Sequence, residues 1–390
     1  MICIIVVRPI DTKISAYHAF AETNDSNFYA SIAKEGYSFS PARPMNATGF
    51  FPGYPVLAKL VSLVLPVDTQ YALNIAAQAT CIGMWMYFLL FLRRWKTPPS
   101  LTFTCVLALF SFPSAFYFVK GYSESLFTFS LLGALYWLTD TQRPRWLLAS
   151  IHGFILSATR LLGLPLSILP ATYALIMIRY DRSLWNKLSL WIPALGSSLI
   201  FSLGALSFFG FLSSTFGQWN LYFQSQFLGW QHSPSIQLFL DWHIFLMFPP
   251  NLDRIAWFIG DLNRLSVPFL FEMLFLLLGL ELFIKTKSIP SLFSARVPFY
   301  LTAILLFFGS IAACGIQLGN TVFFGGMLRY GLVVYVVLLL IFAHAASSLS
   351  LSSALIKRIL LALVIIASIG SLGLQLFLNI IFQETINFVA

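Results

Sequence analysis

Five charged residues are the candidates for chemistry in this 390-residue chain. Asp25 lies in the polar stretch NDSNFYASIAKEGY, and Glu124 lies four residues after Lys120 in FYFVKGYSESLF. Arg160 and Arg329, like Lys120, are each the lone basic residue of a short segment between apolar runs. A carboxylate that is ionised at neutral pH can take a proton from a hydroxyl group. Cations can stabilise negative charge that develops in a reaction.

The elements that must position these residues are membrane-spanning helices. Only 9% of the residues are charged and 58% are hydrophobic, whereas soluble domains are about a quarter charged. Apolar runs near the ~20 residues that cross a bilayer recur from residue 71 onward. These runs are continuous rather than alternating, which excludes a transmembrane β-barrel. The sequence therefore predicts an all-α polytopic membrane protein of about 10–11 transmembrane helices, with no hydrophilic domain.

The whole chain, 1–390, is interpreted as one integral membrane domain. Its first non-cytoplasmic segment covers 1–70, a second covers 213–267, and spans fill 71–212 and 268–390. Residues 54–66 predict a short helix at the membrane interface. Ten spans are expected near 71–92, 101–119, 122–139, 146–159, 162–178, 188–212, 268–284, 297–318, 330–349 and 359–382. The fourth and fifth could form one hairpin bent at Arg160 and Leu161.

The basic residues predict the orientation of the chain. The net charge of +9 does not indicate a nucleic-acid partner, because the Lys and Arg residues lie between apolar runs. Thirteen of the 23 fall in alternate short loops, which are therefore expected to be cytoplasmic. These loops are 93–100, 140–145, 179–187, 285–296 and 350–358. Lys120, Arg160 and Arg329 occupy the short loops of the opposite side.

The two long non-cytoplasmic segments hold most of the irregular sequence. The initial MICIIVV is too short to span, and we expect it to be the end of a helix that begins before residue 1. SIQLFLDWHIFLMF predicts an amphipathic helix on the membrane surface. Trp219, Trp230 and Trp242 fit an interfacial aromatic belt or a sugar-stacking surface. His232 and His243, with Asp241 between them, do not have a recognised metal-ligand spacing.

An ordered series of motifs runs along the chain. NDSNFYASIAKEGY, GFFPGYPVL, GYSESLF and SATRLLG come first, and FQSQFLGWQHSP and LRYGLVVY follow. Over nearly its whole length this series resembles the PIG-V-like mannosyltransferases of the GT-C glycosyltransferase superfamily. FFPGYP and YSESLF together are the most specific part. The resemblance implies a GT-C-like helix bundle whose active-site loops lie on the non-cytoplasmic side.

The resemblance also implies a reaction. A hexose, mannose first, would pass from a polyprenyl-phosphate carrier (dolichyl or undecaprenyl) to a glycolipid or other acceptor, with inversion at the anomeric carbon. Asp25 is the expected base, and Glu124 a second catalytic acid or an acceptor-orienting group. The expected ligands of the donor phosphate are Lys120, Arg160 and Arg329. Further substrate contacts are expected from Tyr54, Tyr122, Gln226 and Trp230. The chemistry requires no metal or other cofactor.

Simpler interpretations of the same residues remain open. Asp25 could be a helix N-cap, and Glu124 could pair with Lys120 across one helical turn. The lone basic residues could anchor lipid headgroups. A transporter or lipid flippase, or a non-catalytic membrane subunit of the same fold, is the alternative function; Thr23-Asn24 departs from the family pattern. The expected location is a bacterial cytoplasmic membrane, with the endoplasmic reticulum as the alternative.

Overall fold

The computed structural model describes residues 24–43, 45–140, 143–178, 184–230, 232, 267, 269–278, 290–318, 321–324, 326–348, 366 and 368–374. The initial apolar run, the predicted surface helix at 235–248 and most of the last predicted span lie outside these residues. The described part is helical apart from one antiparallel hairpin. This hairpin pairs β1 (Gly315–Leu318) with β2 (Thr321–Phe324).

Four of the described helices are long and apolar enough to cross a membrane. They are α5 (Thr69–Arg94), α10 (Leu184–Phe216), α14 (Pro290–Cys314) and α15 (Met327–Ser348). At 1.5 Å per residue each exceeds or approaches the ~30 Å of a bilayer core. With the shorter apolar helices around them, they make the chain an all-α polytopic membrane protein, as the sequence predicts.

Shorter apolar helices pack between the long ones. They are α4 (Gly53–Val64), α6 (Pro99–Phe110), α7 (Glu124–Leu138), α8 (Trp146–Thr159) and α9 (Leu169–Ile178). Helix α6 ends nine residues before the predicted span does. Pro113 follows it, and the residue before a proline avoids the helical conformation. The chain continues instead in the 3-10 helix η2 (Ala115–Phe118).

Arg160 breaks the chain between the fourth and fifth predicted spans. It caps α8 in an extended conformation, with φ −154° and ψ 147°. Two 3-10 turns, η3 (Leu161–Gly163) and η4 (Pro165–Ile168), then lead into α9. The bend predicted at this point is confirmed. It leaves the Arg160 side chain at the end of a helix rather than in its middle.

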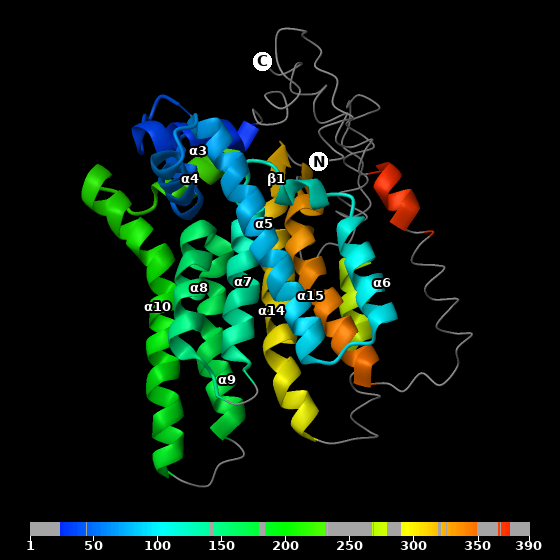
Figure 1. The fold of residues 1–390 in the computed structure, drawn as a ribbon. Helices are drawn as coiled ribbons and strands as arrows, with labels where there is room; N and C mark the ends of the chain where they lie inside the picture. Colours follow the sequence, from blue (N-terminus) through cyan, green and yellow to red (C-terminus); the bar gives the residue numbers. More distant parts are fainter. Residues whose placement is uncertain are drawn as a thin grey trace.

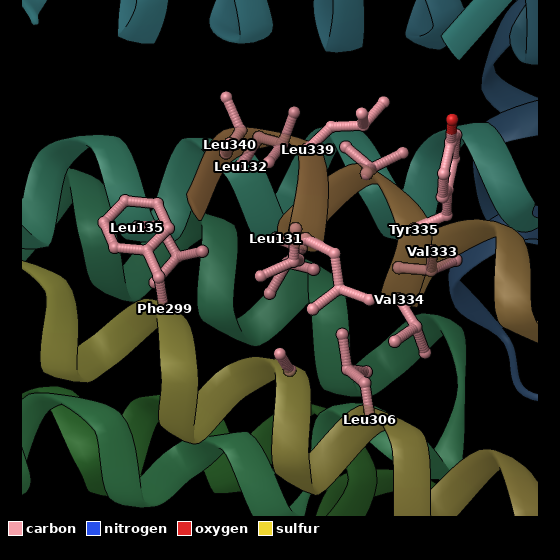
Figure 2. Close-up of a cluster of buried hydrophobic side chains, with 14 of the residues drawn as sticks. Leu131, Leu132, Leu135, Phe299, Leu306, Val333, Val334, Tyr335, Leu339 and Leu340 are labelled. Carbon is pink, nitrogen blue, oxygen red and sulfur yellow. The ribbon is translucent and has the colours of Figure 1, made fainter. Parts of the chain in front are cut away.

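The core lies where α7, α14 and α15 meet, and Figure 2 shows Leu131, Leu135, Phe299 and Val334 converging there. Residues 332–341 of α15 are all buried, on every side of the helix. A helix that is apolar all round belongs in the centre of a bundle. Lipid is as apolar as these side chains, so close packing rather than the hydrophobic effect holds the helices together.

The predicted start of the span that follows the loop 285–296 is also wrong. The loop expected at 285–296 ends inside α14, which begins at Pro290. Arg296 is therefore a helical residue, and it is almost completely buried. Its Nε donates to Nδ1 of His344 on α15 over 3.0 Å. A basic residue counted as a loop charge is thus a packed, hydrogen-bonded residue between two spans.

Helices α3 (Asn24–Glu35) and α4 and strand β1 lie at one end of the bundle (Figure 1). Helices α5, α7 and α15 begin at this end, while α8 and α14 finish there. Residues from distant parts of the sequence therefore meet at a single layer. Asp25 lies in the first turn of α3, as predicted for the start of a short helix.

Candidate functional site

The loop of residues 46–53 forms one wall of the site. Asn46 ties the start of this loop to the preceding segment, because its Oδ1 accepts from Ser40 N over 2.9 Å while its Nδ2 donates to the Arg43 carbonyl over 2.6 Å. The ring of Phe51 lies 4.9 Å from that of Phe208. A Cβ on Gly53 would lie 2.8 Å from the Ala158 carbonyl oxygen. The absence of a side chain there brings the FFPGYP motif against the last turn of α8.

Helix α11 (Leu221–Trp230) covers this loop. Ser225 Oγ lies 2.8 Å from Thr48 Oγ1, and both side chains are buried. Gln226 Nε2 donates to the Gly49 carbonyl over 2.8 Å. These two bonds join segments about 177 residues apart in sequence. They fix α11 as a cover over the end of the bundle.

A cavity of about 470 Å³ lies beneath this cover. Its polar side is formed by Asp25, Arg160, Gln226, His232 and Arg329. Its apolar side is formed mainly by Leu161, Leu162, Pro165, Gly309, Ala312 and Ala313. Aromatic rings of Phe50, Phe51, Phe223 and Phe227 complete the wall. The cavity is therefore amphipathic, with its charged groups on one side.

Two carboxylates and two guanidinium groups form a continuous ion cluster at the charged side. Arg329 donates through Nε to Oε1 of Glu124 and through Nη1 to Oδ2 of Asp25. Arg160 Nη1 donates to the same Glu124 oxygen over 3.1 Å. The four residues come from α3, α7, the end of α8 and the start of α15. The cluster thus connects four elements and carries no net charge.

Burial separates the two carboxylates. The Asp25 side chain is 22% exposed and lines the cavity, whereas the Glu124 side chain is completely buried and does not line it. The Arg160 and Arg329 side chains are 10% and 14% exposed, and both line the cavity. Buried ions are costly unless each keeps its partner. The exposed N–H groups of the arginines and one Asp25 oxygen are therefore what the cluster can offer a ligand.

Aromatic rings support the arginines. The Arg329 guanidinium lies 4.4 Å from the centroid of Tyr122, and that of Arg160 lies 4.5 Å from the centroid of Tyr330. Such cation–π contacts restrict where a guanidinium can lie. Tyr122 is almost completely buried and does not line the cavity. Its contact is with Arg329, and not with the space that a substrate would fill.

The structure does not bring every predicted residue to the cavity. Tyr54 is completely buried, and its hydroxyl donates to the Leu73 carbonyl over 2.6 Å. Lys120 is also buried, with Nζ 5.1 Å from the centroid of Phe116, and it does not line the cavity. Gln226 does line it. Trp230 ends α11, and its side chain lies outside the described residues.

His232 lines the cavity. The sequence predicted no role for it, because its spacing from His243 is not a recognised metal-ligand spacing. Its backbone N–H donates to the Gln226 carbonyl over 3.1 Å. Burial lowers the pKa of the imidazole, and nearby Asp25 opposes this only in part, so the ring is neutral at pH 7. The described residues contain no group of three His, Cys, Asp or Glu that could hold a metal ion. The sequence feature that could have placed His232 at the site is the motif FQSQFLGWQHSP, which also contains Gln226.

The lining of the cavity combines groups that can bind an anion with apolar surface. Two guanidinium groups can bind a phosphate or carboxylate through charge-assisted hydrogen bonds, and the apolar side can hold a hydrocarbon chain. Asp25 adds a carboxylate that can take a proton from a bound hydroxyl. A scan against protein-family models finds no match for the chain, and no curated protein matches it either. The function must therefore be argued from the residues and their geometry.

Proposed function

We propose that the protein is a membrane glycosyltransferase that moves a hexose, mannose first, from a polyprenyl-phosphate donor to a hydroxyl acceptor. The observation that carries this proposal is the cavity that combines Asp25, Arg160 and Arg329 with an apolar wall. Each part of the donor has a counterpart in that cavity. The phosphate meets the arginines, the lipid meets the apolar side, and the acceptor hydroxyl meets Asp25.

The reaction is a single displacement. The acceptor oxygen attacks the anomeric carbon from the face opposite the phosphate, and its proton passes to a carboxylate oxygen of Asp25. The bond between the anomeric carbon and the phosphate oxygen breaks, and the electron pair leaves with the lipid phosphate. Attack from the opposite face inverts the anomeric configuration. Arg160 and Arg329 stabilise the charge on the leaving phosphate.

The ion pair between Asp25 and Arg329 gives donor binding a role in activation. Arg329 donates a hydrogen bond to one oxygen of Asp25. A donor phosphate brings competing oxygens to the same guanidinium. Once Arg329 turns to the phosphate, the Asp25 carboxylate is free to accept the acceptor proton. Asp25 would then accept a proton from the acceptor hydroxyl only when the donor is bound.

The apolar side of the cavity suits the lipid part of the donor. Gly309, Ala312 and Ala313 expose little side chain on α14, and Leu162 and Pro165 face them from the turns after α8. Phe308, the neighbour of Gly309 in the chain, is 44% exposed, and Ile168, in the 3-10 turn that begins at Pro165, is 51% exposed. An isoprenoid chain can therefore extend from the apolar wall toward surrounding lipid. Phe223 and Phe227 on α11 offer faces on which a sugar ring can stack.

The distribution of basic residues supports a non-cytoplasmic site. Helix α5, whose last turn carries Arg93 and Arg94, ends at the end of the bundle opposite α3 and α4 (Figure 1). Loops rich in Lys and Arg remain in the cytoplasm. The proposed location is a bacterial cytoplasmic membrane, with the endoplasmic reticulum membrane as the alternative. The proposed partners are the lipid-linked donor, a glycolipid or other acceptor, and membrane lipids.

Sugar transfer by membranes that contain the chain tests this function. The donor is radiolabelled polyprenyl-phosphate mannose, and total lipid extract supplies acceptors. Transfer by the wild type, and none by Asp25→Asn, would support the proposal. A lipid flippase or a non-catalytic subunit would use the cavity for binding alone. For those functions we expect no transfer from any hexose donor, while donor binding persists in Asp25→Asn.

A further inference from the structure

We propose that Glu124 is a positioning and charge-balancing residue, which acts through Arg160 and Arg329 and takes no proton itself. In this role it holds both guanidinium groups on one oxygen and keeps their attraction for the lipid phosphate weak enough for release. The inference rests on the proposed function and deepens it. It assigns the two carboxylates of the site to different tasks.

The first observation is the place of Glu124. It is the first residue of α7, its side chain is completely buried, and it does not line the cavity. A proton-transfer group must reach the proton that it moves, directly or through one water. Asp25, by contrast, lines the cavity. Glu124 can therefore affect a ligand only through residues that do reach the cavity.

The second observation is how Glu124 uses its two oxygens. Oε1 accepts from both Arg160 and Arg329. Oε2 is buried, and none of the described residues donates a hydrogen bond to it. Two guanidinium groups that meet at one oxygen are held close to one another. Each arginine has five N–H donors, so each keeps several for a ligand in the cavity.

The third observation is the charge balance. Two guanidinium groups held together repel one another, and the buried Glu124 carboxylate offsets this repulsion. Without it, the cavity would present an excess positive charge to the phosphate. Binding of the anionic donor would become stronger, and release of the lipid phosphate product would become slower. An active transferase must release that product in every cycle.

Two variants separate charge from position. Glu124→Gln keeps the length of the side chain and an oxygen that can accept from both arginines, but it removes the charge. Glu124→Asp keeps the charge but withdraws the carboxylate by one methylene group, which disturbs the position of both arginines. A displacement of about 1 Å in a catalytic group can cost about 100-fold in rate. The two variants should therefore change different quantities.

The experiment measures binding of geranyl phosphate to the purified full chain in detergent, together with kcat and KM for sugar transfer. For Glu124→Gln we expect binding about tenfold tighter than for the wild type. We expect kcat to fall by no more than about tenfold. The size follows from removing one charge near the phosphate in a medium of low dielectric constant. For Glu124→Asp we expect binding near that of the wild type and kcat about 100-fold lower.

Asp140→Asn is the matched control. It also removes one negative charge, and Asp140 lies just beyond the other end of α7, where it pairs with Arg145 over 3.4 Å. This variant should bind geranyl phosphate as the wild type does. An equal tightening in Asp140→Asn and Glu124→Gln would overturn the inference, because net charge alone would then explain it.

Other outcomes also overturn the inference. Unchanged or weaker binding in Glu124→Gln would remove the charge-balancing role. Loss of a limb of the pH profile of kcat/KM in Glu124→Gln would make Glu124 a proton-transfer group. If the wild type transfers no sugar, the proposed function fails, but the binding measurements still decide whether Glu124 restrains the affinity for a lipid phosphate. A thermal unfolding curve for each variant shows whether the bundle is intact.

Discussion

Two polar clusters lie within the same helix bundle, and they differ in how completely their hydrogen bonds are satisfied. In the first, Trp137 Nε1 donates to the Tyr87 hydroxyl over 2.9 Å, and this hydroxyl lies 3.0 Å from His152 Nε2. His152 Nδ1 lies 2.8 Å from the Leu148 carbonyl. A carbonyl only accepts, so Nδ1 carries the proton and Nε2 accepts from Tyr87. Every group in this neutral network has a partner.

The second cluster is the ion cluster of Asp25, Glu124, Arg160 and Arg329. It contains full charges, it borders a cavity, and none of the described residues donates to Oε2 of Glu124. A satisfied neutral network rigidifies a bundle, whereas exposed donors and charges can exchange partners with a ligand. The neutral network therefore joins α5, α7 and α8. The charged cluster lies at one end of the bundle and keeps groups that can bind a ligand.

Asp25→Asn should give the largest effect on activity and should leave the neutral network intact. Loss of a general base costs about 10²–10⁴-fold in rate, and we expect sugar transfer to fall by about 10³-fold. The measurement is initial transfer rate per amount of folded protein. Glu35→Gln is the control, because Glu35 lies exposed on the same helix α3. Equal losses in both variants would contradict a specific role for Asp25.

Arg329→Lys should give the next largest effect. Lysine keeps the charge, but its ammonium group cannot present the planar set of donors that contacts both Asp25 and Glu124. We expect kcat/KM for the donor to fall by about 10²-fold. Measurement of donor binding alongside turnover should show weaker phosphate affinity. A variant with wild-type kinetics would show that positive charge alone is sufficient at this position.

Tyr87→Phe tests the neutral network instead of the ion cluster. It removes the hydroxyl that links Trp137 and His152, and it leaves their nitrogen atoms without that partner. We expect unfolding to become easier by about 1–2 kcal/mol, in line with hydrogen bonds between membrane helices. Thermal unfolding in detergent measures the change, and kcat should stay within about twofold of wild type. Thr104→Val, which removes an exposed hydroxyl bonded to its own helix, is the control.

Ala313→Phe should give the smallest effect among the substitutions in the cavity. The added ring would fill part of the apolar side of the cavity, where the lipid part of the donor is expected. We predict that KM for a long polyprenyl donor rises about tenfold, with a smaller change for a geranyl donor. Gly210→Phe is the control, since a Cβ at Gly210 would meet nothing within 4 Å. Equal changes for both donors would contradict the proposed lipid wall.

The sequence predicted the helices better than their contacts. Long apolar runs identify spans without tertiary information, and α5, α7 and α8 begin and end within two residues of the prediction. The early end of α6 follows from Pro113, whose effect on the helix a run of apolar residues does not reveal. Arg296 was assigned to a loop because a basic residue near a span end fits either place. Only its partner His344, 48 residues away, identifies it as a helix residue.

The site was predicted in its charged residues and not in their pairing. Asp25 was singled out as the base, and Arg160 and Arg329 as lone basic residues of short loops, and the three do share one cavity. For Glu124 the sequence offered only Lys120 as a possible ion-pair partner, because a pattern of local spacing reveals only local partners. The arginines that contact Glu124 lie 36 and 205 residues away. Tyr54 and Tyr122 were expected at the substrate, yet their surroundings bury them against protein.

The exact match of two anions and two cations in the ion cluster has a consequence for a protein in an energised membrane. A membrane potential acts on each elementary charge with about 2.3 kcal/mol per 100 mV when that charge crosses the full field. A cluster without net charge experiences almost no net force from that potential. The potential should therefore not displace the ion cluster as a unit, whether the membrane is energised or not. Any voltage dependence of turnover would arise from the charge that the ligand brings.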